Sequence, residues 1–249
     1  MIRLTNIEKY YNKGMPNEVH ALKQLSLDIA DKEFVVLIGS NGSGKSTLLN
    51  MIAGAELPTE GRIEINGTDV TRLPDYKRSK WIARVFQNPL SGTAPELTIL
   101  DNFRLAALRT QSKKLSIGIS DRFRSEVKER ISHLGMGLEN KLNQQMGTLS
   151  GGQRQALTLV MSIMDDVQVL LLDEPTAALD PRSAQTILQA ADNIIKEYNL
   201  TGVLVTHNMK DAHQYGTRLI QMAEGNIIRD ISTTEKSKLA VTDIFGWFS

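Results

Sequence analysis

Three short apolar runs of this chain each end at a polar or glycine-rich cluster. They span residues 34–38, 167–172 and 202–206. Continuous runs of β-branched residues and leucine, bounded by turn residues, are typical of strands buried on both faces of a parallel sheet. Ligands bind outside the carboxyl ends of such strands in open α/β sheets. We therefore expect the three polar clusters to converge on one site.

Helical patterns follow each cluster. After Lys45, apolar residues share one helical face until Gly54, which can end the helix. After Asp180, which can cap, a period near 3.6 continues through residues 181–198, and residues 208–215 show a further helical pattern. The alternation of strand and helix predicts an α/β fold.

More than a hundred residues separate the first strand-turn-helix unit from the acidic strand end, far more than a simple βαβ unit needs. Residues from about 90 to 162 look mostly helical, which predicts an inserted helical subdomain within one domain, 1–249. Within it, residues 109–130 hold seven basic and three acidic side chains. A solvated surface is the favoured interpretation, and a docking face for an anionic or membrane-bound partner remains the alternative.

Composition narrows the function classes. The chain has 249 residues, 29 basic and 28 acidic side chains and no cysteine. Disulfides, thiolate zinc sites and cysteine nucleophiles are thereby excluded, and no histidine cluster suggests a metal. The net charge of +1 gives no argument for nucleic acid as a partner. No apolar run reaches membrane-spanning length and the N-terminus lacks a signal-peptide pattern, so we expect a cytoplasmic protein.

A phosphate-binding loop is the first chemical motif. The pattern follows a strand and opens a helix, and its residues are Gly39, Ser40, Asn41, Gly42, Ser43, Gly44, Lys45 and Ser46. Glycines let backbone N–H groups surround phosphate oxygens, and the helix N-terminus favours negative charge. We expect Lys45 to bridge the terminal phosphates, Ser46 to bind Mg²⁺ and Thr47 to reach the α-phosphate.

An acidic pair ends the second apolar run. A carboxylate at the end of a buried strand is costly unless a cation meets it, so Asp173 is predicted to lie beside a magnesium ion. Glu174 points elsewhere and is available to polarise water for attack on the γ-phosphate. The two motifs together predict a ligand whose terminal phosphates are held with Mg²⁺.

A third motif, Leu149-Ser-Gly-Gly-Gln, places a second helix N-terminus in the chain. Ser150 can cap the helix that follows, and Gly151 and Gly152 leave their N–H groups unblocked for an anion. We include Gln153 in this predicted anion-binding group.

With these motifs the chain resembles the ATP-binding cassette (ABC) ATPases nearly from end to end. Residues 39–47, 149–153 and 169–173 match the Walker A, signature and Walker B motifs. The resemblance implies a P-loop cassette with a RecA-like core, an N-terminal antiparallel β subdomain and an inserted helical signature subdomain. It makes residues 178–180 the D-loop.

The resemblance also implies roles for single residues. Glu174 occupies the position of the catalytic glutamate, His207 that of the switch histidine, and Gln87 that of the glutamine that senses Mg²⁺ and touches the transporter. Tyr11 is similar to the aromatic residue that stacks on adenine, with Tyr10 as the less favoured substitute. Metal contacts are expected from Ser46, Gln87 and Asp173.

In this family two cassettes meet head to tail, and each ATP lies between the Walker A loop of one and the signature motif of the other. The resemblance therefore implies a second cassette, which we expect to be an identical chain, a separate integral membrane permease and, through it, a substrate-binding protein. The cassette would sit on the inner face of the cell membrane. Residues 239–248, an amphipathic tail, are expected to pack on their own domain.

The cargo is less well specified. Residues 86–99 and 205–212 look most like cassettes of bacterial uptake systems for amino acids. One alternative is the lipoprotein-release or macrolide-efflux type of cassette, whose N-terminal spacing is similar. Another is a soluble cassette of the iron–sulfur assembly type, whereas DNA-repair clamps are disfavoured because no sustained heptad repeat is present.

Overall fold

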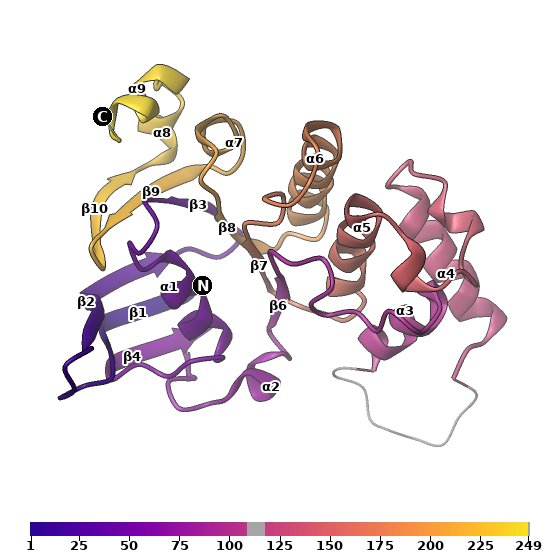
Figure 1. Cartoon of the computed structure of the whole chain (residues 1–249), viewed down its shortest axis with the longest axis horizontal. Helices are drawn as coiled ribbons and strands as arrows, with labels where there is room; N and C mark the ends of the chain where they lie inside the picture. The colour runs from indigo at the N-terminus through magenta and orange to yellow at the C-terminus, as the bar shows by residue number, and fades with distance from the viewer. Residues whose placement is uncertain (109–117, 249) are drawn as a thin grey trace.

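The computed structural model describes residues 1–108 and 118–248 (Figure 1). Part of the basic stretch 109–130 therefore lies outside the described residues. Two sheets and a separate group of helices make up the described chain, with the sheets at one end of its long axis and helices α3 to α5 at the other. No helix among the described residues is both long and apolar enough to cross a membrane.

The larger sheet has the strand order β10-β9-β3-β8-β7-β6. Its strands are β3 (Phe34–Ile38), β6 (Ile82–Val85), β7 (Val169–Asp173), β8 (Thr201–Val205), β9 (Arg218–Ala223) and β10 (Asn226–Ile231). All neighbouring pairs are parallel except β9 and β10. Strands β3, β8 and β7 are adjacent, so the predicted convergence of the three polar clusters at one edge is confirmed.

The smaller sheet is antiparallel with the order β2-β1-β4-β5. Its strands are β1 (Ile2–Tyr11), β2 (Val19–Ile29), β4 (Glu60–Ile65) and β5 (Thr68–Asp69). Apolar side chains of this sheet and of helix α1 (Lys45–Ala53) share one core with alternate residues of β3, β7 and β8. Val35 and Leu37 enter this core while Val36 and Ile38 enter the core on the opposite face, as expected for strands buried on both faces.

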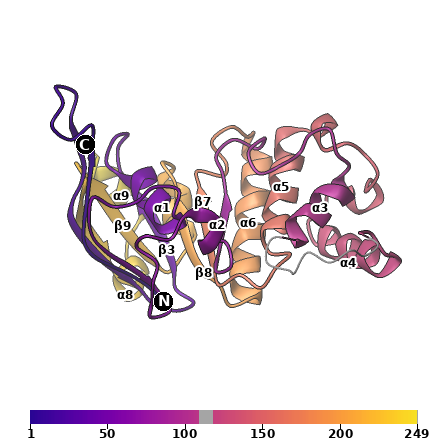
Figure 2. The same cartoon turned by 90° about the horizontal axis from the view of Figure 1, so that it is seen from below.

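The remaining helices pack at the end of α1, as α2 does, cover the other face of the larger sheet or form the insertion. They are α2 (Asp75–Arg78), α3 (Ile99–Ala107), α4 (Asp121–Ser132), α5 (Gly151–Ser162), α6 (Pro181–Glu197), α7 (Met209–Gln214), α8 (Thr233–Lys236) and α9 (Val241–Gly246), with 3-10 turns at Leu138–Asn140 and Met146–Thr148. Helices α3, α4 and α5 enclose a core of their own, and α5 and α6 join it to the larger sheet (Figure 2).

The C-terminal segment packs on its own domain, as expected from its amphipathic pattern. Ile244 of α9 is fully buried, in the same apolar core as residues of α6 and α7. Buried Lys236 donates through Nζ to the carbonyl of Gly216 at 2.9 Å and also to that of Tyr215, and the ring of His213 contacts the carbonyl of Leu239 at 2.8 Å. The segment is thus tied to α7 and the turn that follows it.

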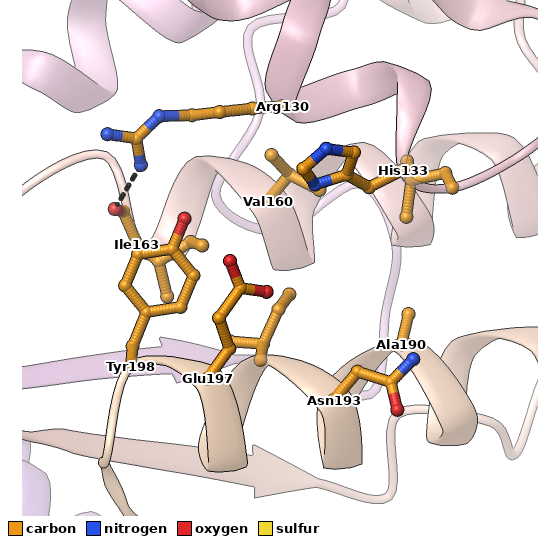
Figure 3. A pocket seen from close by; sticks show the side chains of 10 residues that line it. Arg130, His133, Val160, Ile163, Ala190, Asn193, Glu197 and Tyr198 are labelled. Carbon is orange, nitrogen blue, oxygen red and sulfur yellow. Dashed lines mark hydrogen bonds between the residues drawn. The ribbon is translucent and has the colours of Figure 1, made fainter.

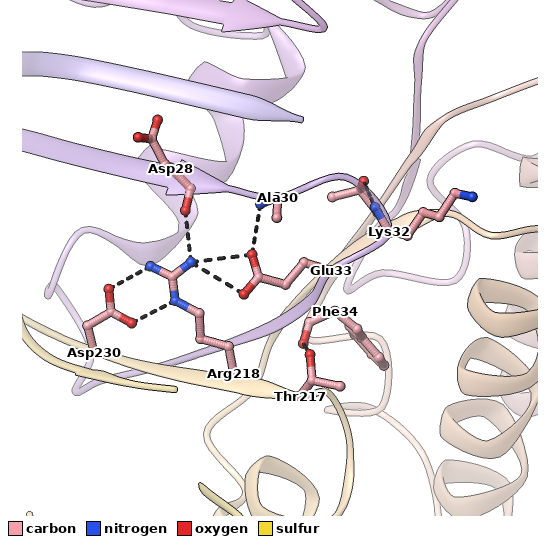
Figure 4. A network of polar contacts seen from close by, with 9 residues as sticks. Asp28, Ala30, Lys32, Glu33, Phe34, Thr217, Arg218 and Asp230 are labelled. Atoms are coloured by element: carbon pink, nitrogen blue, oxygen red, sulfur yellow. Dashed lines mark hydrogen bonds and ion pairs between the residues drawn. The ribbon is translucent and has the colours of Figure 1, made fainter. Parts of the chain in front are cut away.

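A single arginine links the two sheets (Figure 4). Arg218, at the start of β9, donates through Nη1 to the carbonyl of Asp28 at 2.8 Å, in β2 of the smaller sheet. Its Nη2 lies 2.6 Å from Oδ2 of Asp230, and its Nη1 lies 3.3 Å from Oε2 of Glu33. Because this guanidinium is mostly buried and fully engaged, it holds the small sheet against the strands that position the site.

Candidate nucleotide site at the carboxyl edge of the parallel sheet

The loop between β3 and α1 has a backbone that only glycine tolerates at key positions. Gly44 has a φ of 100°, and a Cβ there would lie 2.8 Å from Cδ2 of Leu22 and 2.9 Å from the carbonyl of Ala21. Gly44 is also the N-cap of α1, and no side chain caps this helix. The first-turn N–H groups of α1 therefore remain available to an anion.

Lys45 is folded back onto the loop. Its side chain is buried, and Nζ donates to the carbonyls of Gly39 at 2.7 Å and Ser40 at 3.0 Å. Burial lowers the pKa of Lys45, while the nearby carboxylates Glu174 and Asp173 oppose this shift. The ammonium is thus held among groups that stabilise its charge, where it can be redirected to phosphate oxygens.

A cavity of about 530 Å³ opens beside this loop. It is lined by Tyr11, Val19, His20, Ala21, Lys23, residues 41–47, Glu174 and Glu224. Tyr11 donates its hydroxyl to Oε2 of Glu56 at 2.5 Å, and its oxygen lies 3.4 Å from Oγ1 of Thr47. Tyr10 instead stacks on His20, with ring centroids 3.9 Å apart. The structure therefore places Tyr11, rather than Tyr10, at the cavity.

Glu174 and His207 meet at the ends of neighbouring strands. Nδ1 of His207 lies 3.2 Å from Oε2 of Glu174, and the N–H of Glu174 donates to the carbonyl of Val205 at 3.0 Å. Glu174 has a φ of 44°, an uncommon value for a residue with a side chain, which turns it out of the strand direction. Its carboxylate lines both the nucleotide cavity and an adjoining cavity of about 520 Å³ that contains His207. This carboxylate can accept a proton from water, with the imidazole beside it.

Asp173 ends β7 on the same edge. Its Oδ2 lies 2.5 Å from Nη2 of Arg84 on β6. Gln87 is exposed two residues beyond the end of β6, whose last residue, Val85, pairs with Leu172 in β7. The register thus brings Gln87 to the edge where Asp173 lies.

The oxygen donors of this edge fit Mg²⁺. A carboxylate, the hydroxyl of Ser46 and an amide are hard ligands, and Mg²⁺ in nucleotide sites takes one or two protein carboxylates together with substrate phosphates. Among the residues that the structure describes, no group of three His, Cys, Asp or Glu side chains could hold a metal without such help.

The signature residues lie elsewhere in the chain. Ser150 caps α5, its Oγ accepting from the N–H of Gln153 at 3.3 Å, while Oε1 of Gln153 accepts from the N–H of Ser150 at 3.2 Å. Gly152 packs against α6, where a Cβ would lie 2.7 Å from Oγ of Ser183. Residues 149–153 do not line the nucleotide cavity, so within the described chain the structure does not bring the two predicted phosphate-binding helix ends together.

Two polar residues of the site were not anticipated. Glu56, which receives the hydroxyl of Tyr11, follows α1 with no pattern in the sequence to mark it. Arg84 lies two residues after Ile82, so the alternation of a strand could have placed both side chains on the same face of the sheet. Only the pairing of β6 with β7 shows that the neighbour of Arg84 is Asp173.

A separate cavity of about 240 Å³ lies between α4, α5 and α6 (Figure 3). Arg130 borders it and donates through Nη1 to the carbonyl of Ile163 at 2.9 Å. Its lining combines apolar side chains, such as Val160 and Ile163, with those of His133, Glu197 and Tyr198. None of the residues predicted for the nucleotide site lines this cavity.

Comparison with known proteins places this arrangement in a family. A sequence profile described as ABC transporter matches residues 22–177. The tyrosine transport ATP-binding protein of Clostridioides difficile is 41% identical over 251 residues, covering all of this chain and 98% of that protein. The macrolide export ATP-binding/permease protein of Rhodopirellula baltica is 34% identical over 250 residues, which are 96% of this chain but only 35% of that protein.

A solved structure agrees with the sequence comparison. It is the dimeric post-hydrolysis state of an ATP-binding cassette bound to ADP and phosphate, 31% identical to this chain with a TM-score of 0.81. The match covers 94% of this chain and 99% of that one. The chain therefore belongs to the ABC transporter family, as one of its ATP-binding cassettes, and is an ATPase.

Proposed function

We propose that residues 1–249 form a single nucleotide-binding domain that dimerises around two ATP molecules and drives a separate membrane permease. One observation carries the proposal. The open helix end at Gly44 and the signature helix end at Ser150 lie in different parts of the chain, so one nucleotide can contact both only if a second cassette supplies the signature. The solved dimeric cassette with ADP and phosphate supports this assembly for a relative.

Different residues of the chain are proposed to bind the phosphates, the adenine and Mg²⁺. The N–H groups of residues 39–44 and the ammonium of Lys45 hold the β- and γ-phosphates, and Tyr11 offers its ring to the adenine. Ser46, Gln87 and Asp173 would hold Mg²⁺, which neutralises charge developing on the phosphates. Residues 150–153 of the second cassette close over the γ-phosphate.

Hydrolysis needs a base and an orienting group. Glu174 accepts a proton from the attacking water, and His207, 3.2 Å from it, positions that water and the phosphate. Loss of the γ-phosphate removes the anion that joins the two helix ends, so the cassettes separate. This opening and closing is the motion passed to the permease.

A groove at the junction with the inserted helices is suited to a permease segment. It measures about 560 Å³ and is lined by Arg84, residues 92–94, Asn102, Leu105, Ala106, Thr158, Met161 and Ser162. The first loop residues that line the groove, 92–94, follow Gln87 closely in the chain. A segment bound in the groove would therefore act on the position of Gln87, one of the residues proposed to hold Mg²⁺. Attachment here would hold the cassette at the inner face of the membrane.

We propose uptake of an amino acid or a similar small solute, delivered by a substrate-binding protein. The full-length match to a tyrosine transport ATP-binding protein supports this cargo class. Export is the second candidate, because the macrolide export relative matches nearly the whole chain, although its permease lies in the same polypeptide. Purification of the cassette from membranes, followed by mass spectrometry of co-purifying proteins, separates the two: an uptake permease and binding protein support import.

The dimer is tested by Glu174→Gln, which keeps the side-chain size but removes the base. We expect the variant to bind ATP, to hydrolyse it about 10²- to 10⁴-fold more slowly and to elute as a dimer from a sizing column only with ATP. A variant that stays monomeric with ATP and hydrolyses at the wild-type rate would contradict both the dimer and the assigned base. His133→Gln, remote from the nucleotide cavity, is the matched control and should hydrolyse ATP normally.

A further inference from the structure

Arg84 and Asp173 occupy the same face of two paired strands. Arg84 lies opposite Leu171 in the parallel register, and residues two apart in a strand share a face, so Asp173 follows on that face. Nη2 of Arg84 and Oδ2 of Asp173 are 2.5 Å apart, and the two side chains are only 13% and 14% exposed. This is a short, largely buried ion pair at the carboxylate assigned to Mg²⁺.

Apart from this ion pair, few interactions hold the Arg84 side chain in place. Its guanidinium lies 4.8 Å from the centroid of the Phe86 ring, and its Nε is buried without a hydrogen-bond partner among the described residues. Because β6 is the edge strand of the sheet, the side chain also borders the groove lined by residues 92–94, α3 and α5. Space for the guanidinium to move therefore adjoins its present position.

The charges around Asp173 suggest a role for its ion pair with Arg84. The ammonium of Lys45 is also near Asp173, but it donates to the carbonyls of Gly39 and Ser40. Arg84 is therefore the direct ion-pair partner of this partly buried carboxylate when no metal is bound. A magnesium ion approaching the same carboxylate brings two positive charges close to the guanidinium, and like charges at this distance repel. The two cations compete for one carboxylate.

We propose that Arg84 is the counter-ion that holds Asp173 before magnesium binds, and that arrival of Mg²⁺ with ATP displaces its guanidinium toward the groove. Arg84 is thus a positioning residue for the metal site and joins the groove to the nucleotide edge. The inference rests on the proposed binding of Mg²⁺ with ATP.

The test is Arg84→Met, which removes the positive charge of the side chain but keeps much of its length. The substitution is made in the Glu174→Gln chain so that ATP is not consumed. ATP binding is measured by equilibrium dialysis at increasing MgCl₂. We expect the half-saturating Mg²⁺ concentration to fall about five- to tenfold, because the competing cation is gone. Thermal melting without nucleotide should occur at a lower temperature, because the Asp173 carboxylate is left unpaired.

Two further variants keep the test decisive. Arg84→Lys retains a point charge and should give a Mg²⁺ midpoint between those of the parent and Arg84→Met, even if the methionine variant folds poorly. Arg130→Met removes a partly buried arginine that pairs with Glu126 at 2.9 Å far from the nucleotide, and it should leave the midpoint unchanged. A midpoint that is the same in all Arg84 variants would overturn the counter-ion role.

The movement toward the groove has its own test. Ala106→Phe narrows the groove, so it should raise the Mg²⁺ midpoint in the parent chain but leave it unchanged when Arg84 is already methionine. Equal effects in both backgrounds would overturn the displacement. If ATP binding to the parent chain does not depend on Mg²⁺, both the proposed metal site and this inference are wrong. If ATP binding to the parent depends on Mg²⁺ but the Arg84 variants have the same Mg²⁺ midpoint as the parent, only this inference is wrong.

Discussion

Helices α1 and α5 begin in opposite ways, although both N-termini are predicted to meet the same phosphate. Helix α1 begins after Gly44, and no side chain satisfies its first N–H groups. Helix α5 begins with a reciprocal capping box in which Ser150 and Gln153 satisfy each other's backbone N–H groups. No side chain caps the first end, whereas side chains already satisfy two backbone N–H groups at the second, those of Ser150 and Gln153.

For the proposed dimer, the difference predicts that the two halves of one nucleotide site behave differently. Helix α1 gains partners when phosphate binds, so the phosphate loop can bind ATP within a single chain. Where the γ-phosphate binds the N–H group of Ser150 or Gln153, helix α5 must give up a bond of its capping box, so its net gain is smaller there. Binding to the phosphate loop is therefore expected to precede closure by the signature helix of the second chain.

The largest effect is expected at the uncapped end of α1. Lys45→Ala should abolish the rise in melting temperature caused by ATP, which for a ligand at a hundredfold excess over its Kd corresponds to about 2.7 kcal/mol. Lys23→Ala, which removes a lysine from the same cavity but outside the loop, should keep most of that rise. An ATP-induced shift that survives Lys45→Ala would show that the phosphate loop is not the binding element.

At the capped end of α5, two adjacent glycines offer a matched pair. A Cβ on Gly152 would lie 2.7 Å from Oγ of Ser183, whereas one on Gly151 would meet Cδ2 of Leu179 at an ordinary 3.6 Å. We expect Gly152→Ala to unfold with a free energy about 1–2 kcal/mol lower than Gly151→Ala, because α5 and α6 must separate slightly. Urea denaturation of both variants measures the difference, and equal stabilities would mean that the contact between the helices is readily relaxed.

The smallest effect is expected from the capping serine. Ser150→Ala removes the side-chain acceptor of α5 and should lower the free energy of unfolding by about 1 kcal/mol, or the melting temperature by roughly 2–4 °C. In the Glu174→Gln chain the same change should also weaken the ATP-dependent dimer, as measured by analytical ultracentrifugation. If stability falls but the dimer is unaffected, Ser150 is a cap only and the comparison between the two helix ends loses its functional meaning.

Prediction from sequence succeeded where the signal is local. Continuous apolar runs gave β3, β7 and β8, and the adjacency of their ends followed because parallel strands share an edge. The capping role of Ser150 was likewise local, since the serine directly precedes an apolar helical pattern. The placements of Lys45 and Glu174 at one cavity followed from motifs that sit at those strand ends.

Contacts between distant segments could not be predicted in this way. The ion pair of Arg84 with Asp173 depends on β6 pairing with β7 across 89 residues of sequence. The hydrogen bond from Tyr11 to Glu56 depends on how a strand of the small sheet approaches the end of α1. The bond between Arg218 and the carbonyl of Asp28 joins two sheets, and neither sheet indicates it alone.

The attachment of the C-terminal segment to α7 bears on how the protein is handled in the laboratory. Lys236 and Leu239 contact α7 or the turn after it, and α7 begins directly after Asn208, the neighbour of His207. A purification tag fused after residue 249 that displaced this segment would also disturb α7, which begins two residues after His207. An N-terminal tag would start at β1 instead, so kinetic measurements on this cassette are better made with the affinity handle at that end.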